Sequence, residues 1–242
     1  MQATLTTALS LSGAVATVGA LMTHAAFGPE SQLFGRTVIA GHDPNEIALT
    51  YDDGPNPAAT TGLLEVLARY NARATFFMIG AHARRYPELV RAVYAAGHLV
   101  GNHTMTHPWL AWQPGRVIRE ELGGCSKLLE DLTGERVRFM RPPHGARRPA
   151  VMRIARHLGM QTVQWNTMGH DWQPIGAEGI LKYIDGGLRR ARRWRRGANI
   201  LLHDGHQAEL EANRSGTIAV TAALLERLAG TPMRAVTVDA WG

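Results

Sequence analysis

The chain has 242 residues, of which 45% are hydrophobic and 19% are charged, and this composition excludes an intrinsically disordered chain. Its single cysteine, Cys125, excludes both an internal disulfide bond and a cysteine-rich zinc site. The formal net charge of +6 favours anionic partners such as acidic polymers, membrane surfaces or nucleic acid, and leaves the fold open.

An apolar N-terminal segment, residues 1–28, precedes a predicted catalytic domain over residues 29–242. Residues 5–22 carry no charge and approach the roughly 20 apolar residues that cross a bilayer. Three interpretations stay open: a membrane anchor, a signal peptide that ends near residues 23–25, and an alanine-rich helix docked on the domain. No Lys or Arg precedes the run, which counts against the first two. The localisation is therefore open between a membrane-associated or exported protein and a cytoplasmic one.

From Glu46 onward, short β-rich runs alternate with longer amphipathic stretches. Strands are predicted at residues 47–51, 74–79, 99–102, 137–140, 162–165, 200–202 and 235–238. Helices are predicted at residues 88–96, 118–132, 151–158 and 218–228, each followed closely by a glycine. This alternation predicts a parallel sheet with helices outside it, and seven strands favour a closed or nearly closed α/β barrel. An open doubly wound sheet is the alternative.

Ionisable residues follow five of these predicted strands. Because active sites of α/β proteins form at the carboxyl ends of their parallel strands, we expect these side chains to meet at one rim. In chain order they are Asp52 and Asp53, His103 and His107, Arg141, Asp171, and His203 with Asp204.

A metal site is the first expectation for this rim. His103 and His107 are four residues apart, which would place both imidazoles on one side of a helical turn. With a carboxylate from Asp52 or Asp53 they make three ligands and leave a position for water, as in catalytic zinc sites. Since side chains alternate along a strand, we expect the two aspartates to diverge, so that one binds metal and the other takes a proton from the water. An Asp-Gly turn would explain Asp53 alone.

Together these segments resemble the motifs of the polysaccharide deacetylases, carbohydrate esterase family four, also called the NodB-homology domain. The resemblance extends from about Glu46 to Asp239. It rests on TYDDGP at 50–55, HTMTH at 103–107, RPPHG at 141–145, DW at 171–172 and LLHD at 201–204. It implies a distorted (β/α) barrel of about seven parallel strands and one divalent metal ion, usually zinc. It also implies hydrolysis of an N-acetyl group, or sometimes an O-acetyl ester, on a polysaccharide or oligosaccharide.

The resemblance also implies a role for each residue of the rim. The implied metal ligands are Asp53, His103 and His107. Asp52 is implied to be the general base, Arg141 the cation that keeps Asp52 ionised, His203 the general acid and Asp171 the carboxylate that orients it.

The residues implied to contact substrate are Trp172 and Leu202, as walls of the acetyl pocket, and Pro143 and His144. His144 stands where the family usually has Tyr or Phe, and Met168 stands where many relatives have an acidic residue. These two departures bear on substrate detail rather than on reaction type.

A few features stand outside these motifs. Six arginines and a tryptophan at residues 189–196 predict either a solvated helix face, with Trp194 on its core side, or a membrane surface contact. No nucleic acid partner is expected. Trp109 and Trp112 follow the histidine pair and either stack on a sugar ring or pack against the barrel.

Three other functions are weighed against the deacetylase. Two histidines and one aspartate also suit a non-haem iron oxygenase, which does not need the base and acid of the rim. A non-catalytic sugar-binding relative should have lost one of them. A hydrolase of small cyclic amides on the same barrel is the remaining alternative.

Overall fold

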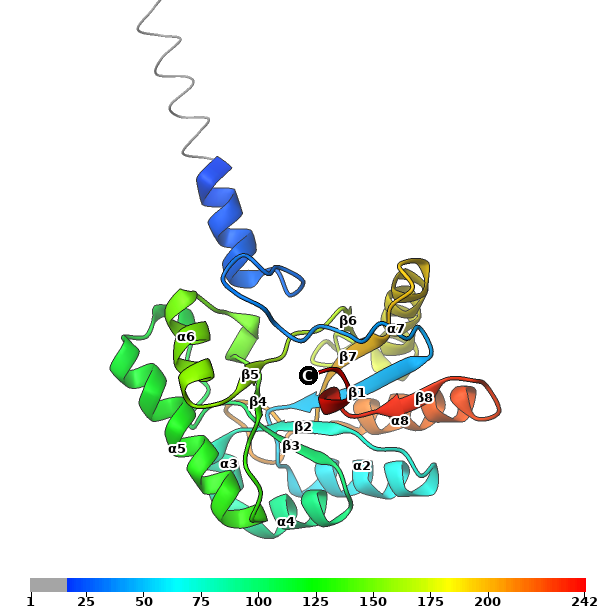
Figure 1. Ribbon diagram of the computed structural model, residues 1–242. Coiled ribbons are helices and arrows are strands. Elements are labelled where there is room, and N and C mark those ends of the chain that lie inside the picture. Colours follow the sequence, from blue (N-terminus) through cyan, green and yellow to red (C-terminus); the bar gives the residue numbers. More distant parts are fainter. Residues whose placement is uncertain (1–16) are drawn as a thin grey trace, which may run out of the picture.

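The computed structural model describes residues 17–242, and its centre is a curled parallel sheet surrounded by helices (Figure 1). Its strands run in the order β5-β4-β3-β2-β1-β7-β6, and β8 pairs with β1 outside this order. Each recorded strand pairing is parallel. The predicted barrel of about seven parallel strands is therefore confirmed. The strands are β1 (Glu46–Asp52), β2 (Thr75–Met78), β3 (Leu99–Asn102), β4 (Phe139–Met140), β5 (Gln161–Thr162), β6 (Thr167–Met168), β7 (Ala198–His203) and β8 (Arg234–Val236).

Local sequence signals mark the start of one barrel helix and the end of another. Asn56 caps the first of the barrel helices by accepting bonds from the N–H groups of Ala58 and Ala59. Gly134 ends the longest in the left-handed region, at φ 76°. The α-helices are α2 (Pro57–Arg69), α3 (Gly80–Arg85), α4 (Pro87–Ala95), α5 (Gly115–Thr133), α6 (Pro149–His157), α7 (Gly176–Arg193) and α8 (Ser215–Leu228). Short 3-10 turns are η1 (Leu110–Trp112), η2 (Pro143–Gly145) and η3 (Val238–Trp241).

Side chains along β1 point alternately to the two sides of the sheet, and the last residue of the strand points into the barrel. Ile47, Leu49 and Tyr51 belong to the large outer core between the sheet and the helices. Ala48 faces inward, in a smaller cluster that includes Phe77 and Phe139. Because side chains alternate along a strand, Asp52 falls on the inner side with Ala48.

The fifth predicted strand is wrong in its extent. Only residues 161–162 pair with β4, and Val163 instead forms a single parallel bridge with Val38 from the segment before β1. The chain then turns at Asn166, whose side chain accepts the N–H of Asn199 and donates to the carbonyl of Gly197. These bonds begin β6, which periodicity did not predict because it has only two residues.

The N-terminal segment meets the domain through its last residues. Residues 17–27 are helical and project from the barrel (Figure 1). Val18, Leu21 and Met22 are about half exposed, whereas Ala25 is fully buried. Contact with the domain therefore starts before the predicted boundary at residue 29. Most of the apolar run at 5–22 lies outside the described residues. Within residues 17–242, no helix combines the length and apolarity needed to cross a membrane.

Candidate active site

Three of the predicted metal ligands converge at the carboxyl ends of β1 and β3. Asp53 Oδ1 lies 3.3 Å from His103 Nε2 and 3.2 Å from His107 Nε2. One potential ligand atom from each of the three residues falls within 4.8 Å of the others. The structure thus brings together the three residues that the sequence predicted as ligands, and their role in binding a metal stays a prediction.

The path of the histidine loop differs from the predicted helical turn. Thr104 and His107 have positive φ values of 70° and 62°, which no α-helix allows. Asn102 accepts the Thr104 N–H at 2.7 Å, and the Thr104 hydroxyl accepts the His107 N–H at 2.9 Å. These bonds fold the loop tightly, so the two imidazoles meet without a helix.

The chemistry of the cluster fits a divalent cation. His103 Nδ1 donates to the carbonyl of Arg141 at 2.7 Å, which leaves Nε2 as the nitrogen that faces Asp53. Asp53 Oδ1 is buried and has no hydrogen-bond partner among the described residues. Burial raises the pKa of Asp53, but the two histidines outweigh it and hold that pKa well below its usual value. Burial lowers the pKa of His103, and the carboxylates of Asp52 and Asp53 reverse this and raise it. A bound cation would instead face Asp53 Oδ1 and the Nε2 atoms of both histidines, and its binding would require these groups to be deprotonated.

Asp52 and Asp53 face the same site, which corrects the prediction that they diverge. Asp52 ends β1 with its side chain inward, and its Oδ2 lies 3.8 Å from His103 Nε2. Asp53 leaves the strand at φ 72°, and this left-handed turn swings its carboxylate back over the same opening. The strand rule fails here because it applies only while the backbone stays extended.

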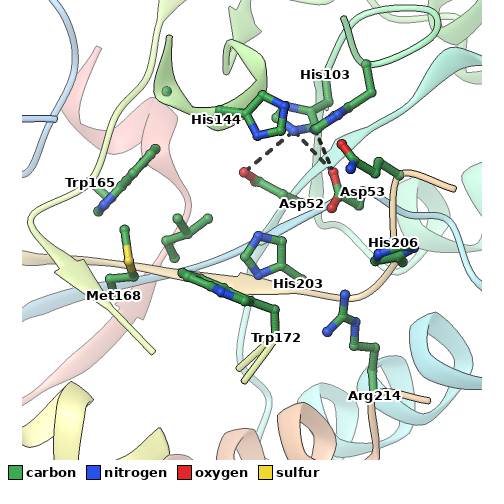
Figure 2. A pocket seen from close by; sticks show the side chains of 14 residues that line it. Asp52, Asp53, His103, His144, Trp165, Met168, Trp172, His203, His206 and Arg214 are labelled. Atoms are coloured by element: carbon green, nitrogen blue, oxygen red, sulfur yellow. Dashed lines mark ion pairs between the residues drawn. The ribbon is translucent and has the colours of Figure 1, made fainter. Parts of the chain in front are cut away.

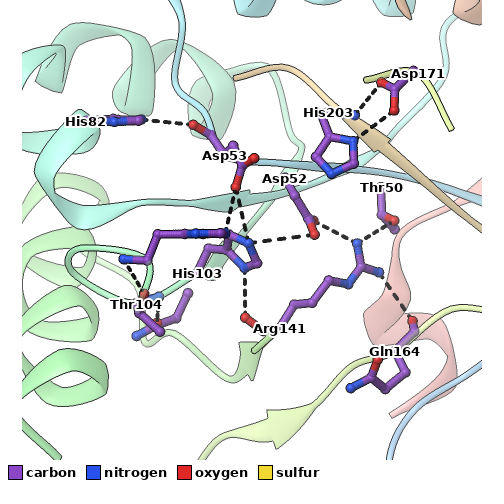
Figure 3. A network of polar contacts seen from close by, with 12 residues as sticks. Thr50, Asp52, Asp53, His82, His103, Thr104, Arg141, Gln164, Asp171 and His203 are labelled. Atoms are coloured by element: carbon purple, nitrogen blue, oxygen red, sulfur yellow. Dashed lines mark hydrogen bonds and ion pairs between the residues drawn. The ribbon is translucent and has the colours of Figure 1, made fainter. Parts of the chain in front are cut away.

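Arg141 holds Asp52 from inside the barrel (Figure 3). Its Nη1 donates to Asp52 Oδ1 at 2.8 Å and to the Thr50 hydroxyl at 2.8 Å. The guanidinium is fully buried, and its carbon lies 4.3 Å from the centre of the Phe77 ring. Burial lowers the pKa of Arg141, and the Asp52 carboxylate acts in the opposite direction. One oxygen of Asp52 is thereby fixed, and the other faces the cluster.

A second pair, His203 and Asp171, lies at the end of β7. His203 Nδ1 and Asp171 Oδ1 are 2.8 Å apart, and Asp171 Oδ2 accepts the His203 backbone N–H at 2.8 Å. The Thr217 hydroxyl donates to the same oxygen at 2.7 Å. Burial lowers the pKa of His203, but Asp171 outweighs it and raises the pKa to about 9. His203 therefore carries a proton at neutral pH.

Both groups open into one pocket of about 400 Å³ (Figure 2). Asp52, Asp53 and His103 lie on one side of His203, and Trp172, Met168 and Trp165 gather on another. The lining is Asp52, Asp53, His103, His107, His144, Gly145, Trp165, Met168, Trp172, Leu201, His203, His206, Gln207 and Arg214. The pocket is thus polar at the cluster and at His206, Gln207 and Arg214, and it is apolar at Trp165, Met168, Trp172 and Leu201.

Two predicted contact residues are misplaced. Leu202 is fully buried in the outer core, and its neighbour Leu201 lines the pocket instead. The reason is alternation along β7, which puts Leu201 on the same side as His203. Pro143 is buried beside the pocket, whereas the next residues, His144 and Gly145, line it.

Sequence reasoning missed several supporting residues. Arg214 lines the pocket and donates to the carbonyl of Gly205 at 2.8 Å, and it precedes a helix with no motif around it. Thr217, which holds Asp171, is one of many threonines. The inward side of β7 was the one usable signal, since alternation from His203 identifies Leu201.

His144 has an unusual environment at the pocket rim. Its φ is 58°, so its side chain is turned outward from the loop of η2. The ring lies edge to face with His107, at 4.7 Å between centroids, and stacks on Trp109 at 3.8 Å and 17°. Burial lowers the pKa of His144 to about 4, and His107 acts in the same direction. Its ring is thus neutral at neutral pH.

Comparison with known proteins gives consistent results. Residues 40–163 match the family model described as polysaccharide deacetylase. A chitooligosaccharide deacetylase of Azorhizobium caulinodans is 33% identical over 196 residues, which cover 79% of this chain and 90% of that relative. A peptidoglycan-N-acetylglucosamine deacetylase of Bacillus cereus is 37% identical over 195 residues, covering 80% and 86%. The crystal structure of the Bc1960 peptidoglycan N-acetylglucosamine deacetylase superposes with a TM-score of 0.75 at 27% identity, covering 84% and 91%.

Proposed function

The chain belongs to the polysaccharide deacetylase family, as its motifs indicated, and we propose that it hydrolyses N-acetyl groups on the sugars of a glycan. The observation that carries this proposal is the pocket, which joins the Asp53–His103–His107 cluster to the buried carboxylate of Asp52 and to the imidazole of His203, which is paired with Asp171. Amide hydrolysis needs an activated water and a proton for the departing amine. The two relatives named above, both deacetylases of glycans by name, support the same substrate class.

The cluster would hold one divalent ion through Asp53, His103 and His107. Two imidazoles and one carboxylate are typical of catalytic zinc, and we propose zinc. When bound, such an ion lowers the pKa of a coordinated water and polarises the acetyl carbonyl. The same three ligands also suit iron oxygenases, but the base and acid in this pocket favour hydrolysis.

Asp52 is proposed to accept the proton of the attacking water. Arg141 occupies its Oδ1 at 2.8 Å, so Oδ2, on the side of His103, is the oxygen available to the water. Both side chains are buried, with relative exposures of 0% for Arg141 and 4% for Asp52. Their ion pair keeps the carboxylate oriented inside the barrel.

His203 is proposed to protonate the leaving nitrogen. Its Nδ1 is held by Asp171, so the proton on Nε2 is the one that can be given to the sugar amine. The water oxygen bonds to the acetyl carbon, the carbon–nitrogen bond breaks, and acetate and a free amine are released. An amine leaves only when protonated, so this acid favours N-acetyl over O-acetyl substrates.

The apolar part of the pocket is proposed to receive the acetyl methyl. Trp172 lies edge to face with His203, at 5.3 Å between ring centroids, and Leu201 shares its side of β7 with His203. A methyl group beside these side chains would place its carbonyl carbon between the cluster and His203.

The test is acetate release across a substrate panel. Purified protein, loaded with zinc, is incubated with N-acetylated chitooligosaccharides, peptidoglycan and O-acetylated xylan. We expect acetate together with an equal amount of free amine from an N-acetylated glycan. Release of acetate from xylan alone would contradict the N-acetyl preference, and release from no substrate would contradict the function.

A further inference from the structure

Exposed aromatic rings continue from the rim of the pocket onto the surface. Trp109 stacks on His144, Phe27 packs at 6.3 Å from Trp109, and Trp112 lies 6.2 Å from Phe27, all between ring centroids. Trp109 is 44% exposed and Trp112 is 70% exposed. We call Phe27, Trp109 and Trp112 the aromatic platform. Neither tryptophan belongs to the cluster or to the acid described above, so the exposure of these two rings asks for another explanation.

The platform is assembled from two distant parts of the chain and is fixed by a buried arginine. Trp109 and Trp112 follow the histidine loop, whereas Phe27 comes from the N-terminal segment. The Arg147 guanidinium donates to the carbonyls of Gly28 at 2.7 Å and Ser31 at 2.8 Å. Its backbone N–H also donates to the Ala26 carbonyl at 3.0 Å. Arg147 thus binds backbone carbonyls both before and after Phe27 in the chain, and these bonds fix the backbone that carries the Phe27 ring.

The same arginine ties the platform to the pocket. Arg147 Nη1 donates to the carbonyl of Gly145 at 3.1 Å, and Gly145 lines the pocket next to His144. Burial lowers the pKa of Arg147 to about 10. Its side chain is 1% exposed. The pocket loop and the segment that carries Phe27 are therefore joined through one buried side chain.

We propose that the aromatic platform binds the pyranose ring adjacent to the acetylated sugar in the pocket, so that the protein acts on chains of several sugars. This rests on the proposed function and names its substrate more closely. The C–H face of a pyranose packs on an aromatic ring while its hydroxyl groups stay in water, which suits rings that are half exposed. Trp109 stacks on His144, and Trp112 is connected to Trp109 through Phe27, so a glycan chain that leaves the pocket past His144 would meet Trp109 before Trp112.

The position of the surface favours a glycan over a membrane or a second copy of the chain. It adjoins the pocket through the His144 ring, which lines the pocket and stacks on Trp109. Trp194 provides the contrast: it is also 70% exposed, yet it lies beside Arg190 and Arg196, in a different hollow of the surface. It corrects the prediction that its ring faces the core, and it serves as a matched control.

The experiment compares a long and a short substrate. We measure kcat/KM of the zinc-loaded full chain for the pentamer of β-1,4-linked N-acetylglucosamine and for 4-nitrophenyl acetate. Trp112→Ala should lower the ratio of the two values about tenfold, mainly through the KM of the pentamer. Trp194→Ala should leave the ratio unchanged. Trp109→Ala should also lower the ratio, and Trp109→Phe should restore part of it.

Two results would overturn the proposal. If Trp112→Ala leaves the ratio of the two kcat/KM values unchanged, the platform does not contact the glycan chain. The same conclusion holds if the variant loses binding to anionic lipid vesicles while the ratio stays unchanged. An equal loss on both substrates means that the rings support the pocket rather than bind sugar. If the wild type hydrolyses neither substrate, the proposed function fails first. The platform is then judged by fluorescence titration with the pentamer, in which Trp112→Ala must weaken binding about tenfold for the proposal to stand.

Discussion

Replacing Asp171 by asparagine tests the proposed acid through its pH dependence. Asp171 is the anionic partner of His203, at 2.8 Å from its Nδ1, and it raises the His203 pKa from 6.5 to about 9 against the effect of burial. That rise corresponds to roughly 3 kcal/mol in favour of the imidazolium, as an order of magnitude. Asparagine keeps the shape of the side chain and removes its charge. The folded-state pKa of His203 should therefore fall, because burial is then opposed only by the smaller effects of Asp53 and Asp52.

The direction of the expected shift in the pH profile follows from the role of His203. A general acid works only while protonated, so the rate is lost as pH rises through its pKa. In the wild type the alkaline limb for an N-acetylated oligomer should lie near pH 9. In Asp171→Asn it should move down by about two pH units, with more than a tenfold loss at pH 8.5 and a smaller one at pH 6.

The assay is kcat/KM for a chitooligosaccharide between pH 5 and pH 10, with 4-nitrophenyl acetate in parallel. A phenolate leaves without a proton, so the ester profile should depend less on His203. The matched control is Asp185→Asn, which removes a carboxylate paired with Arg227 at 3.3 Å on the exposed surface and should leave the alkaline limb in place. An unmoved limb in Asp171→Asn, or equal shifts in both variants, would refute the reasoning.

Three further perturbations address the cluster and its supports. His103→Ala should abolish both zinc content and turnover, because the two remaining ligands hold the ion poorly. Replacing the exposed His157 by alanine is the control and should change neither. Metal analysis after dialysis checks this prediction, and full activity in chelator-treated protein would contradict it. Arg141→Met should destabilise the protein by about 3–5 kcal/mol in urea unfolding because it leaves Asp52 buried and unpaired, and an unchanged unfolding midpoint would show that the pair is not needed. Arg147→Leu should cost about 1–3 kcal/mol by leaving three backbone carbonyls without their donor, and wild-type stability would argue against a fixed N-terminal segment.

The contacts of Arg147 with the N-terminal segment bear on where a shortened but active protein should begin. Every residue of the pocket lies after Tyr51, which by itself predicts that a chain starting near residue 29 would be active. Ala25 is buried and Phe27 contacts both tryptophans of the platform, so such a chain loses these contacts. A chain that starts at residue 17 keeps them.

The sequence was informative where a residue's chemistry is rare and its position regular. Asp52, His103 and His203 stand at the ends of strands, and parallel strands bring their ends together whatever the loops do. The same regularity predicted α5 and its end at Gly134, since a long apolar stripe and a left-handed glycine are both local signals.

The errors arose where the backbone departs from regular geometry. Asp53 and His107 have positive φ, which sequence does not announce for residues other than glycine, so both the diverging aspartates and the helical turn were wrong. Leu202 was predicted in place of its neighbour Leu201, because the prediction ignored that side chains along β7 point alternately to the two sides of the sheet. The platform depends on contacts between Phe27 and Trp109, 82 positions later, and no periodicity reports such a pairing.

The central claim is that a metal-assisted water attacks the acetyl group with Asp52 as base, and Asp52→Asn tests it most directly. The measurement is zinc content and acetate release from an N-acetylated chitooligosaccharide, made on the same preparations of wild type and variant. The account predicts one zinc per chain in both proteins, with nearly all turnover lost in the variant, because asparagine keeps the shape beside Arg141 but cannot accept a proton. Retained turnover would contradict the role of Asp52 as base, and loss of zinc would show that Asp52 is itself a ligand.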